Sequence, residues 1–225
     1  MQKYLVINIK YKIVEIGLFD NSININKVDI ENKNINKYLI NNIDRFLKEA
    51  SISLKDLEFI AVNQGPAPFT TLRSVLSTVN GFNFASQVPL IGVNGIKTLL
   101  QEYISKRPSF VDNNMVIALL NAFGQELYYA YYSNYNNIYI NGCSNYLNLL
   151  KSLKLELNLD SNKNIIFIGN GSELYKQDIL DIFKDKAVFD CQNFDYACLE
   201  AINDQAIQEY NNKNMQDNLM PIYLK

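Results

Sequence analysis

Histidine is missing from all 225 residues of the chain. No imidazole is therefore available as a metal ligand, as a general base or as part of a His–carboxylate relay. This absence excludes zinc peptidases built on an H-E-x-x-H motif and serine hydrolases built on a His relay. The sequence thus lacks the side chain on which many hydrolytic sites depend.

Cysteine and basic clusters are also scarce. Cys143, Cys191 and Cys198 form no C-x-x-C pair, so their spacing indicates neither a disulfide framework nor a zinc site, and we expect reduced thiols. The net charge is −2 and no cluster of Lys and Arg occurs, so we do not expect strong tRNA binding by the chain alone.

Long apolar runs are absent as well. No stretch of 18 apolar residues occurs, so we predict no membrane span and no membrane partner. Charged residues, from Lys3 to Glu15, interrupt the first twenty positions, which argues against a signal peptide. We therefore expect a cytoplasmic protein.

The residues that are present predict an α/β fold. Hydrophobic residues make up 48% of the chain, and along it segments with the strand period of two alternate with segments that have the helix period of about 3.6. Residues 4–9, 12–19 and 23–30 read as strands, the last with a slip in its alternation near Asn26. A helix is predicted at 35–50, a buried strand at 57–62, a loop at 63–68, a helix at 69–86, a strand at 89–93 and a helix at 94–105.

The same order of elements begins again after residues 106–109. Strands are predicted at 115–120, 126–133 and 136–140, a helix at 144–155, a strand at 165–168, a helix at 172–183, a strand at 187–190, a helix at 196–210 and an extended tail at 221–224. We therefore predict two duplicated ribonuclease H-like halves, residues 1–105 and 106–225, which is the plan of the actin-like, sugar kinase and Hsp70 superfamily. The sequence leaves open whether the C-terminal helix or tail packs back on the first half.

Three segments resemble the TsaB family. Residues 65–73 match its G-P-G-S-F-T-G-L-R motif at Gly65, Pro66, Phe69, Thr70, Leu72 and Arg73. Residues 121–128 are similar to D-A-R-x-x-E-V-Y at Ala122, Glu126 and Tyr128, and residues 221–225 are similar to P-x-Y-L-R. The matches keep their order along the chain, and this order is more specific than any one motif.

The resemblance implies a non-catalytic subunit of the tRNA threonylcarbamoyltransferase complex, with no catalytic, cofactor-binding or metal-binding residues. Such a chain would hold the catalytic subunit TsaD in its active form. The ATPase TsaE would join the assembly, and tRNA would be reached only through the complex. The modified base would be the adenosine beside the anticodon.

The sequence departs from the superfamily where a nucleotide would bind. Active members place an acid after the first strand to help hold metal, whereas this chain has Asn8 and Ile9 there, and Asn121 and Phe123 replace the acid and the arginine of the second motif. A nucleotide-dependent kinase of the same superfamily remains an alternative, which tight Mg·ATP binding would favour. Residues 65–70 form either a phosphate cradle or a rigid turn, and we favour the turn because prolines remove two donors.

The helix at 69–86 carries the candidate docking surface. Leu72, Val75, Leu76, Val79 and Phe82 form the face that we expect on the sheet. The other face is a stripe of small residues, which allows another helix to approach closely. Together with the neighbouring helix at 35–50, this stripe gives the predicted partner-binding residues Leu39, Ile43, Phe46, Thr70, Ser74, Ser77, Thr78, Gly81 and Ala85. The alternatives are that the stripe packs only on the chain's own helix, or that the chain is a homodimeric module.

Overall fold

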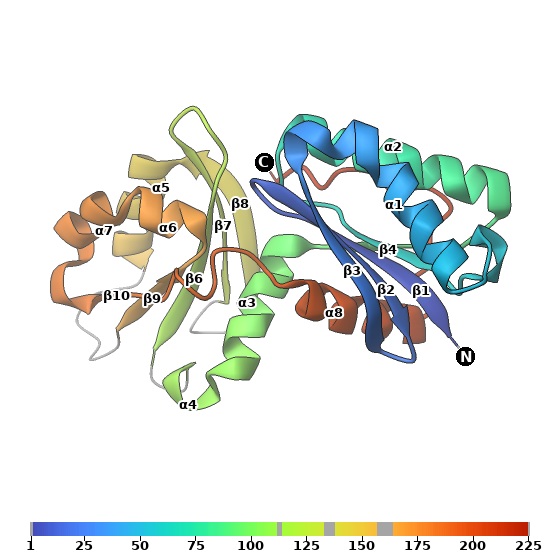
Figure 1. Ribbon diagram of the computed structural model, residues 1–225. Helices are drawn as coiled ribbons and strands as arrows, with labels where there is room; N and C mark the ends of the chain where they lie inside the picture. Colours follow the sequence, from blue (N-terminus) through green and yellow to red (C-terminus); the bar gives the residue numbers. More distant parts are fainter. Residues whose placement is uncertain (1, 112–113, 133–137, 157–163, 225) are drawn as a thin grey trace. The chain divides into compact units, whose positions relative to one another are not determined.

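The computed structural model describes residues 2–111, 114–132, 138–156 and 164–224 (Figure 1). Within them, the strands form two five-stranded sheets with the orders β3-β2-β1-β4-β5 and β10-β9-β6-β7-β8. Backbone contacts group Met1–Gly95 with Cys198–Ile222 as unit 1, and Ile96–Ala197 with Tyr223–Lys225 as unit 2. A domain boundary at residues 105–106 stays a prediction.

Unit 1 is built on the first sheet. Its strands are β1 (Lys3–Ile9), β2 (Ile13–Asp20), β3 (Ile23–Glu31), β4 (Ile60–Asn63) and β5 (Leu90–Val93). Helices α1 (Ile35–Glu49) and α2 (Phe69–Ser86) cover one face, and α8 (Leu199–Asn211) covers the other (Figure 1). Short 3-10 turns lie at Asn32–Asn34 and Leu54–Asp56. The sheet is therefore the middle of three layers.

Both faces of this sheet are buried because both are covered. β4 is buried at all four positions, as is typical of a parallel strand between helices. On the α8 face, the ring of Phe59 lies 4.4 Å from that of Tyr4 and 4.9 Å from that of Tyr210 of α8. The predicted slip in β3 is confirmed, since the pairing of β2 with β3 shifts at Leu18/Phe19, opposite Asn26.

Unit 2 repeats the order of elements. It contains β6 (Met115–Asn121), β7 (Glu126–Tyr132), β8 (Tyr139–Asn145), β9 (Ile165–Ile168) and β10 (Ala187–Phe189). Its helices are α3 (Gly95–Lys106), whose first residue still belongs to unit 1, α4 (Pro108–Val111), α5 (Tyr146–Glu156), α6 (Asn170–Leu174) and α7 (Lys176–Phe183), with a 3-10 turn at Lys184–Lys186. Helices α5 and α7 pack over the sheet around Phe167 and Phe183. The two sheets thus share one topology, which confirms the predicted duplication.

Some predicted bounds are wrong. The helix predicted at 172–183 is interrupted at Tyr175, whose ring stacks on that of Tyr146 of α5 at 4.1 Å. The strand predicted at 57–62 begins only at Ile60, because a 3-10 turn precedes it. The last helix begins at Leu199, where the sulfur of Cys198 accepts a hydrogen bond from the N–H of Ala201. The strand predicted at 136–140 is found at Tyr139–Asn145, and its first two positions lie outside the described residues.

Candidate partner-docking surface

The small residues of α2 lie on its outer side, opposite the side that packs on the sheet. Leu72, Val75, Leu76 and Val79 are buried, as the sequence predicts, and Phe82 is half-buried against the same core. Thr70, Ser77, Gly81 and Ala85 are exposed, and Ser74 and Thr78 are partly exposed. These six residues form one continuous strip, which we call the small-residue stripe.

The three predicted residues of α1 are placed differently. Leu39, Ile43 and Phe46 are each only 2% exposed, because they point into the core of unit 1. They hold α1 on the sheet, and these three side chains offer almost no surface that a partner could contact. That they bind a partner stays a prediction. Helix α1 is also tied to α2 by a hydrogen bond from the hydroxyl of Ser74 to the side-chain oxygen of Asn36.

Exposed apolar side chains flank the stripe, and the sequence reasoning missed them. Ile40 of α1 is 55% exposed, and Phe84 of α2 is 85% exposed. Each falls outside the apolar face of its helix, and this was the signal available in the sequence. Phe69, at the start of α2, is also exposed, and the guanidinium of Arg73 lies over its ring at 4.0 Å.

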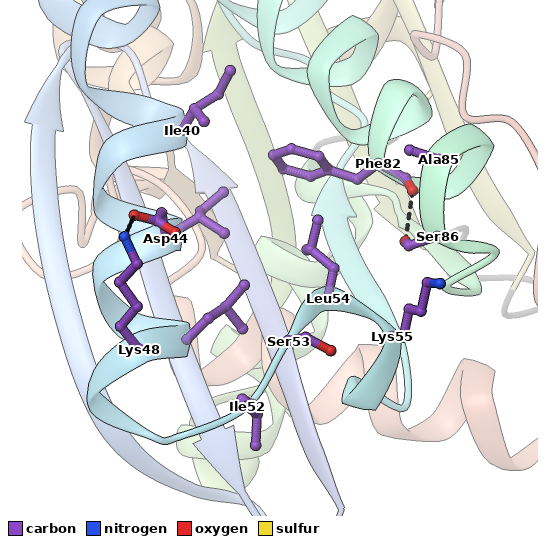
Figure 2. A pocket seen from close by; sticks show the side chains of 12 residues that line it. Ile40, Asp44, Lys48, Ile52, Ser53, Leu54, Lys55, Phe82, Ala85 and Ser86 are labelled. Atoms are coloured by element: carbon purple, nitrogen blue, oxygen red, sulfur yellow. Dashed lines mark hydrogen bonds and ion pairs between the residues drawn. The ribbon is translucent and has the colours of Figure 1, made fainter.

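A groove opens between the C-terminal parts of α1 and α2. It has a volume of about 530 Å³, and the turn at residues 52–55 closes one end (Figure 2). Ile40 and Phe82 line it from the two helices, and Leu54 lines it from the turn. On α1, Lys48 pairs with Asp44 at 2.7 Å beside this apolar lining. Ala85 belongs both to the groove and to the small-residue stripe, so the two features are continuous.

A buried polar cluster occupies the face of the sheet that α8 covers. Asn8 is 1% exposed and lies opposite Glu15 in the pairing of β1 with β2; its amide nitrogen donates to the Glu15 carboxylate at 2.9 Å. The ammonium groups of Lys10 and Lys27 lie 3.2 Å and 3.0 Å from the same carboxylate. Asn63 of β4 donates to the Asn8 oxygen at 2.9 Å, so with Lys27 of β3 the cluster spans four strands.

The negative charge of Glu15 is neutralised within this cluster. Burial alone would raise the pKa of Glu15, but the charge of Lys10 and the hydrogen bonds from Lys27 and Asn8 outweigh it and hold the pKa below its usual value of 4.5. Glu15 is therefore a carboxylate at neutral pH and already has two cationic partners. Glu15 was not singled out from the sequence, although it is the charged residue in the buried middle of strand β2.

The loop before α2 is held by the same network. The N–H of Gly65 donates to the side-chain oxygen of Asn63 at 2.9 Å, and the carbonyl of Gly65 accepts from the N–H of Gly95 at 2.9 Å. The donor that a phosphate would require at Gly65 is thus already engaged. This geometry is that of a rigid turn.

Asn121 and Phe123 lie in the hairpin between β6 and β7. The N–H of Phe123 donates to the side-chain oxygen of Asn121 at 2.9 Å, and the N–H of Asn121 donates to the side-chain oxygen of Asn170 at 3.1 Å. The Phe123 side chain is 57% exposed and its φ is +63°. Asn121 therefore shapes a turn in this chain.

Two broader properties hold for the described residues. No group of three or more His, Cys, Asp or Glu side chains in this part of the chain is arranged to hold a metal ion. None of the described helices combines the length and the apolar character that crossing a membrane requires.

The duplicated topology places the chain in a fold class. An inorganic polyphosphate/ATP-glucomannokinase from Arthrobacter sp. strain KM matches over 92% of this chain and all of that one, with a TM-score of 0.50 and 8% identity. YeaZ from Pseudomonas aeruginosa matches over the whole of both chains, with a TM-score of 0.70 and 18% identity. The predicted α/β fold of two duplicated halves is confirmed, and the chain shares this fold with the two solved structures.

The family is defined more narrowly by sequence. The chain belongs to the family described as TsaD, tRNA N6-adenosine threonylcarbamoyltransferase, whose model matches residues 29–218. It is also similar to the tRNA threonylcarbamoyladenosine biosynthesis protein TsaB of Buchnera aphidicola subsp. Baizongia pistaciae, with 26% identity over 191 residues that cover 83% of this chain and 81% of the relative. The predicted resemblance to the TsaB family is confirmed.

The residues at the end of β1 do not fit the metal-bound nucleotide that active members of the superfamily hold. A divalent cation prefers carboxylate oxygens, but position 8 carries an amide whose oxygen and nitrogen both bond to neighbours. The nearest carboxylate, Glu15, already faces two ammonium groups. A metal ion there would have to displace both lysines.

Proposed function

We propose that the chain acts in the biosynthesis of tRNA threonylcarbamoyladenosine as a scaffold subunit without catalytic activity of its own. The name of its relative and the description of its family support the pathway. The scaffold role is supported by the chain's lack of histidine and by the internal neutralisation of Glu15, the carboxylate nearest to the expected metal position.

The partner in this proposal is a TsaD-type catalytic subunit, and the docking surface is the outer side of α1 and α2. The observation that carries it is the accessibility of the small-residue stripe, since an exposed helix face of a monomer normally carries long polar side chains instead. Small side chains let a partner helix approach toward the lower end of the usual separation of about 8–10 Å. The groove beside Ala85 would then receive a large apolar side chain of the partner.

The resemblance to the TsaB family implies two other components of the proposed assembly. A TsaE-type ATPase would join the complex, and tRNA would be bound through the complex, because the net charge of −2 provides no basic surface for a polyanion. A homodimer formed through the same face of α2 is the competing arrangement. Sedimentation of the chain alone and with the partner distinguishes the two.

Gly81→Leu is the sharpest test of this surface. A Cβ built at Gly81 meets no atom of the described chain within 4 Å, so the leucine projects into open space and should not disturb the fold. Leucine also favours a helix over glycine by up to about 1 kcal/mol, so the variant should be at least as stable as the wild type. We expect it to abolish co-purification with the TsaD-type subunit and stimulation of tRNA modification.

Ser74→Trp should have the same effect on binding, although it also removes the hydrogen bond to Asn36 and is the less clean variant. Gln208→Trp is the matched control, because Gln208 is exposed on α8, on the opposite side of the sheet. The control should bind normally. Wild-type affinity in both Gly81→Leu and Ser74→Trp refutes the docking surface, and turnover of a substrate by the isolated chain refutes the scaffold role.

A further inference from the structure

The C-terminal part of unit 1 runs back along the sheet edge and beside α2. We call residues 216–222 the C-terminal strap (Figure 1, the red coil next to α2). The backbone of Gln216 pairs with that of Leu90 of β5 in both directions, at 2.8 Å and 3.2 Å. The side chain of Gln64 donates to the carbonyl of Met220 at 2.8 Å, and the carbonyl of Gln64 accepts from the N–H of Ile222 at 3.0 Å. The strap is therefore fixed at both ends.

Between these ends, α2 itself binds the strap. The side-chain amide of Asn80 donates to the carbonyl of Leu219 at 3.0 Å, and its oxygen accepts from the N–H of Leu219 at 2.8 Å. The Leu219 side chain is 1% exposed and packs in the same core as Val79. One residue of α2 thus forms a two-bond clamp on the strap.

The part of α2 that follows Asn80 is held less firmly: Phe82 is half-buried against the core, and the side-chain amide of Asn83 donates to the carbonyl of Val88 at 2.9 Å. In this helix, which the structure describes throughout, no side chain after Val79 is fully buried. Gly81 lies in these turns and weakens a helix relative to alanine. The helix then ends at Gln87, which adopts the left-handed conformation with φ 59°. The last turns of α2 are thus the part of the helix with the weakest packing on the sheet.

These same turns carry Gly81 and Ala85 of the small-residue stripe, and Phe82 and Ser86 of the groove. We infer that the C-terminal strap positions the docking surface: Asn80, by clamping Leu219, keeps the end of α2 helical and in place for the partner. Asn80 is a positioning residue, because it belongs to neither the small-residue stripe nor the groove and affects both only by holding the helix end. The role of the strap in docking rests on the proposed function, which names the partner. The clamp of Asn80 on Leu219, which keeps the end of α2 in place, does not depend on that function.

Asn80→Ala tests the clamp, with Ile202→Val as control. Ile202 is buried in α8, so its substitution lowers the stability of unit 1 from the opposite face of the sheet without touching α2 or the strap. Two quantities are measured for each full-length variant: hydrogen exchange at the amides of residues 82–86, and the Kd for the TsaD-type subunit well below the unfolding temperature.

We expect Asn80→Ala to speed exchange at residues 82–86 and to raise the Kd about tenfold. A tenfold rise corresponds to a fall of the population in which the end of α2 is helical to about a tenth of its wild-type value. Ile202→Val should leave both quantities unchanged, because the folded fraction stays near one. Adding Gln87→Gly to Asn80→Ala should restore both, since glycine favours the left-handed cap at the end of α2.

Unchanged exchange in Asn80→Ala overturns the clamp, whatever the partner does. Faster exchange with a wild-type Kd overturns its role in docking. If the wild-type chain fails to bind the TsaD-type subunit at all, the proposed function fails, and the exchange measurement on the chain alone still decides whether the strap holds the end of α2.

Discussion

Replacing Glu15 by glutamine tests the buried polar cluster with almost no change in shape. The wild-type carboxylate is 5% exposed and lies 3.2 Å from Lys10 and 3.0 Å from Lys27. Removing one partner of a buried ion pair costs about 3–5 kcal/mol. The two lysine side chains are 20% and 39% exposed and can turn toward water, so we expect Glu15→Gln to lower the free energy of unfolding by about 2–3 kcal/mol at neutral pH.

The pH dependence of this loss has a defined sign. The pKa of Glu15 is lowered in the folded state, so its stabilising effect is fully present above the pKa of about 4.3 that glutamate has in an unfolded chain. The effect is lost as the pH falls through the folded-state pKa, because the carboxylate then becomes protonated. The difference in stability between wild type and Glu15→Gln should therefore be constant near neutral pH and shrink below about pH 4.

Urea unfolding of both proteins, near neutral pH and at about pH 3.5, measures the difference directly. Glu31→Gln is the matched control, since Glu31 pairs with Lys33 at 2.8 Å while both side chains are largely exposed. The control should change the free energy of unfolding by less than about 0.5 kcal/mol. A Glu15→Gln protein as stable as the control near neutral pH would refute the argument, and so would a stability difference that does not shrink in acid.

Two further predictions concern unit 2. Gly169→Ala should lower the free energy of unfolding by about 3 kcal/mol or more in urea titrations, because φ is +89° and the added Cβ would lie 2.1 Å from the carbonyl oxygen of Leu119; a wild-type midpoint would contradict this. Cys191 should resist thiol reagents near pH 8 until the protein unfolds, because burial raises the pKa of its thiol to about 12. Mass spectrometry of the labelled native protein checks this, and rapid labelling of Cys191 would contradict it.

Periodic patterns allowed most of the fold to be predicted. The apolar positions of α1 recur at spacings of three and four residues, and the helix found at Ile35–Glu49 agrees with the prediction. The repeated order of elements indicated two halves with one topology, as observed. The break at Tyr175 could not be predicted, because it accompanies a ring contact with Tyr146, which lies on a different helix.

The candidate site was predictable only in part, because several of its features depend on contacts between elements that are distant in the sequence. The small-residue stripe lies on one helix, so the pattern was visible in the sequence, but the sequence left open whether the stripe faces a partner or the chain's own helix. The groove needs two helices and a turn, and the clamp joins residues 139 positions apart, so no local pattern indicates either. Asn8 was noticed in the sequence for its missing charge, whereas its bond to Glu15 depends on how two strands are paired.

The division of unit 1 along the chain has a consequence for its synthesis on the ribosome. Met1–Gly95 emerges early, but α8, which covers one face of the first sheet, comes after the whole of Ile96–Ala197. At about 5–20 residues per second, the intervening segment takes roughly 5–20 s to make. During that delay the rings of Tyr4 and Phe59 lack Tyr210 as a cover, so the nascent sheet presents an apolar face for which chaperones have time to compete.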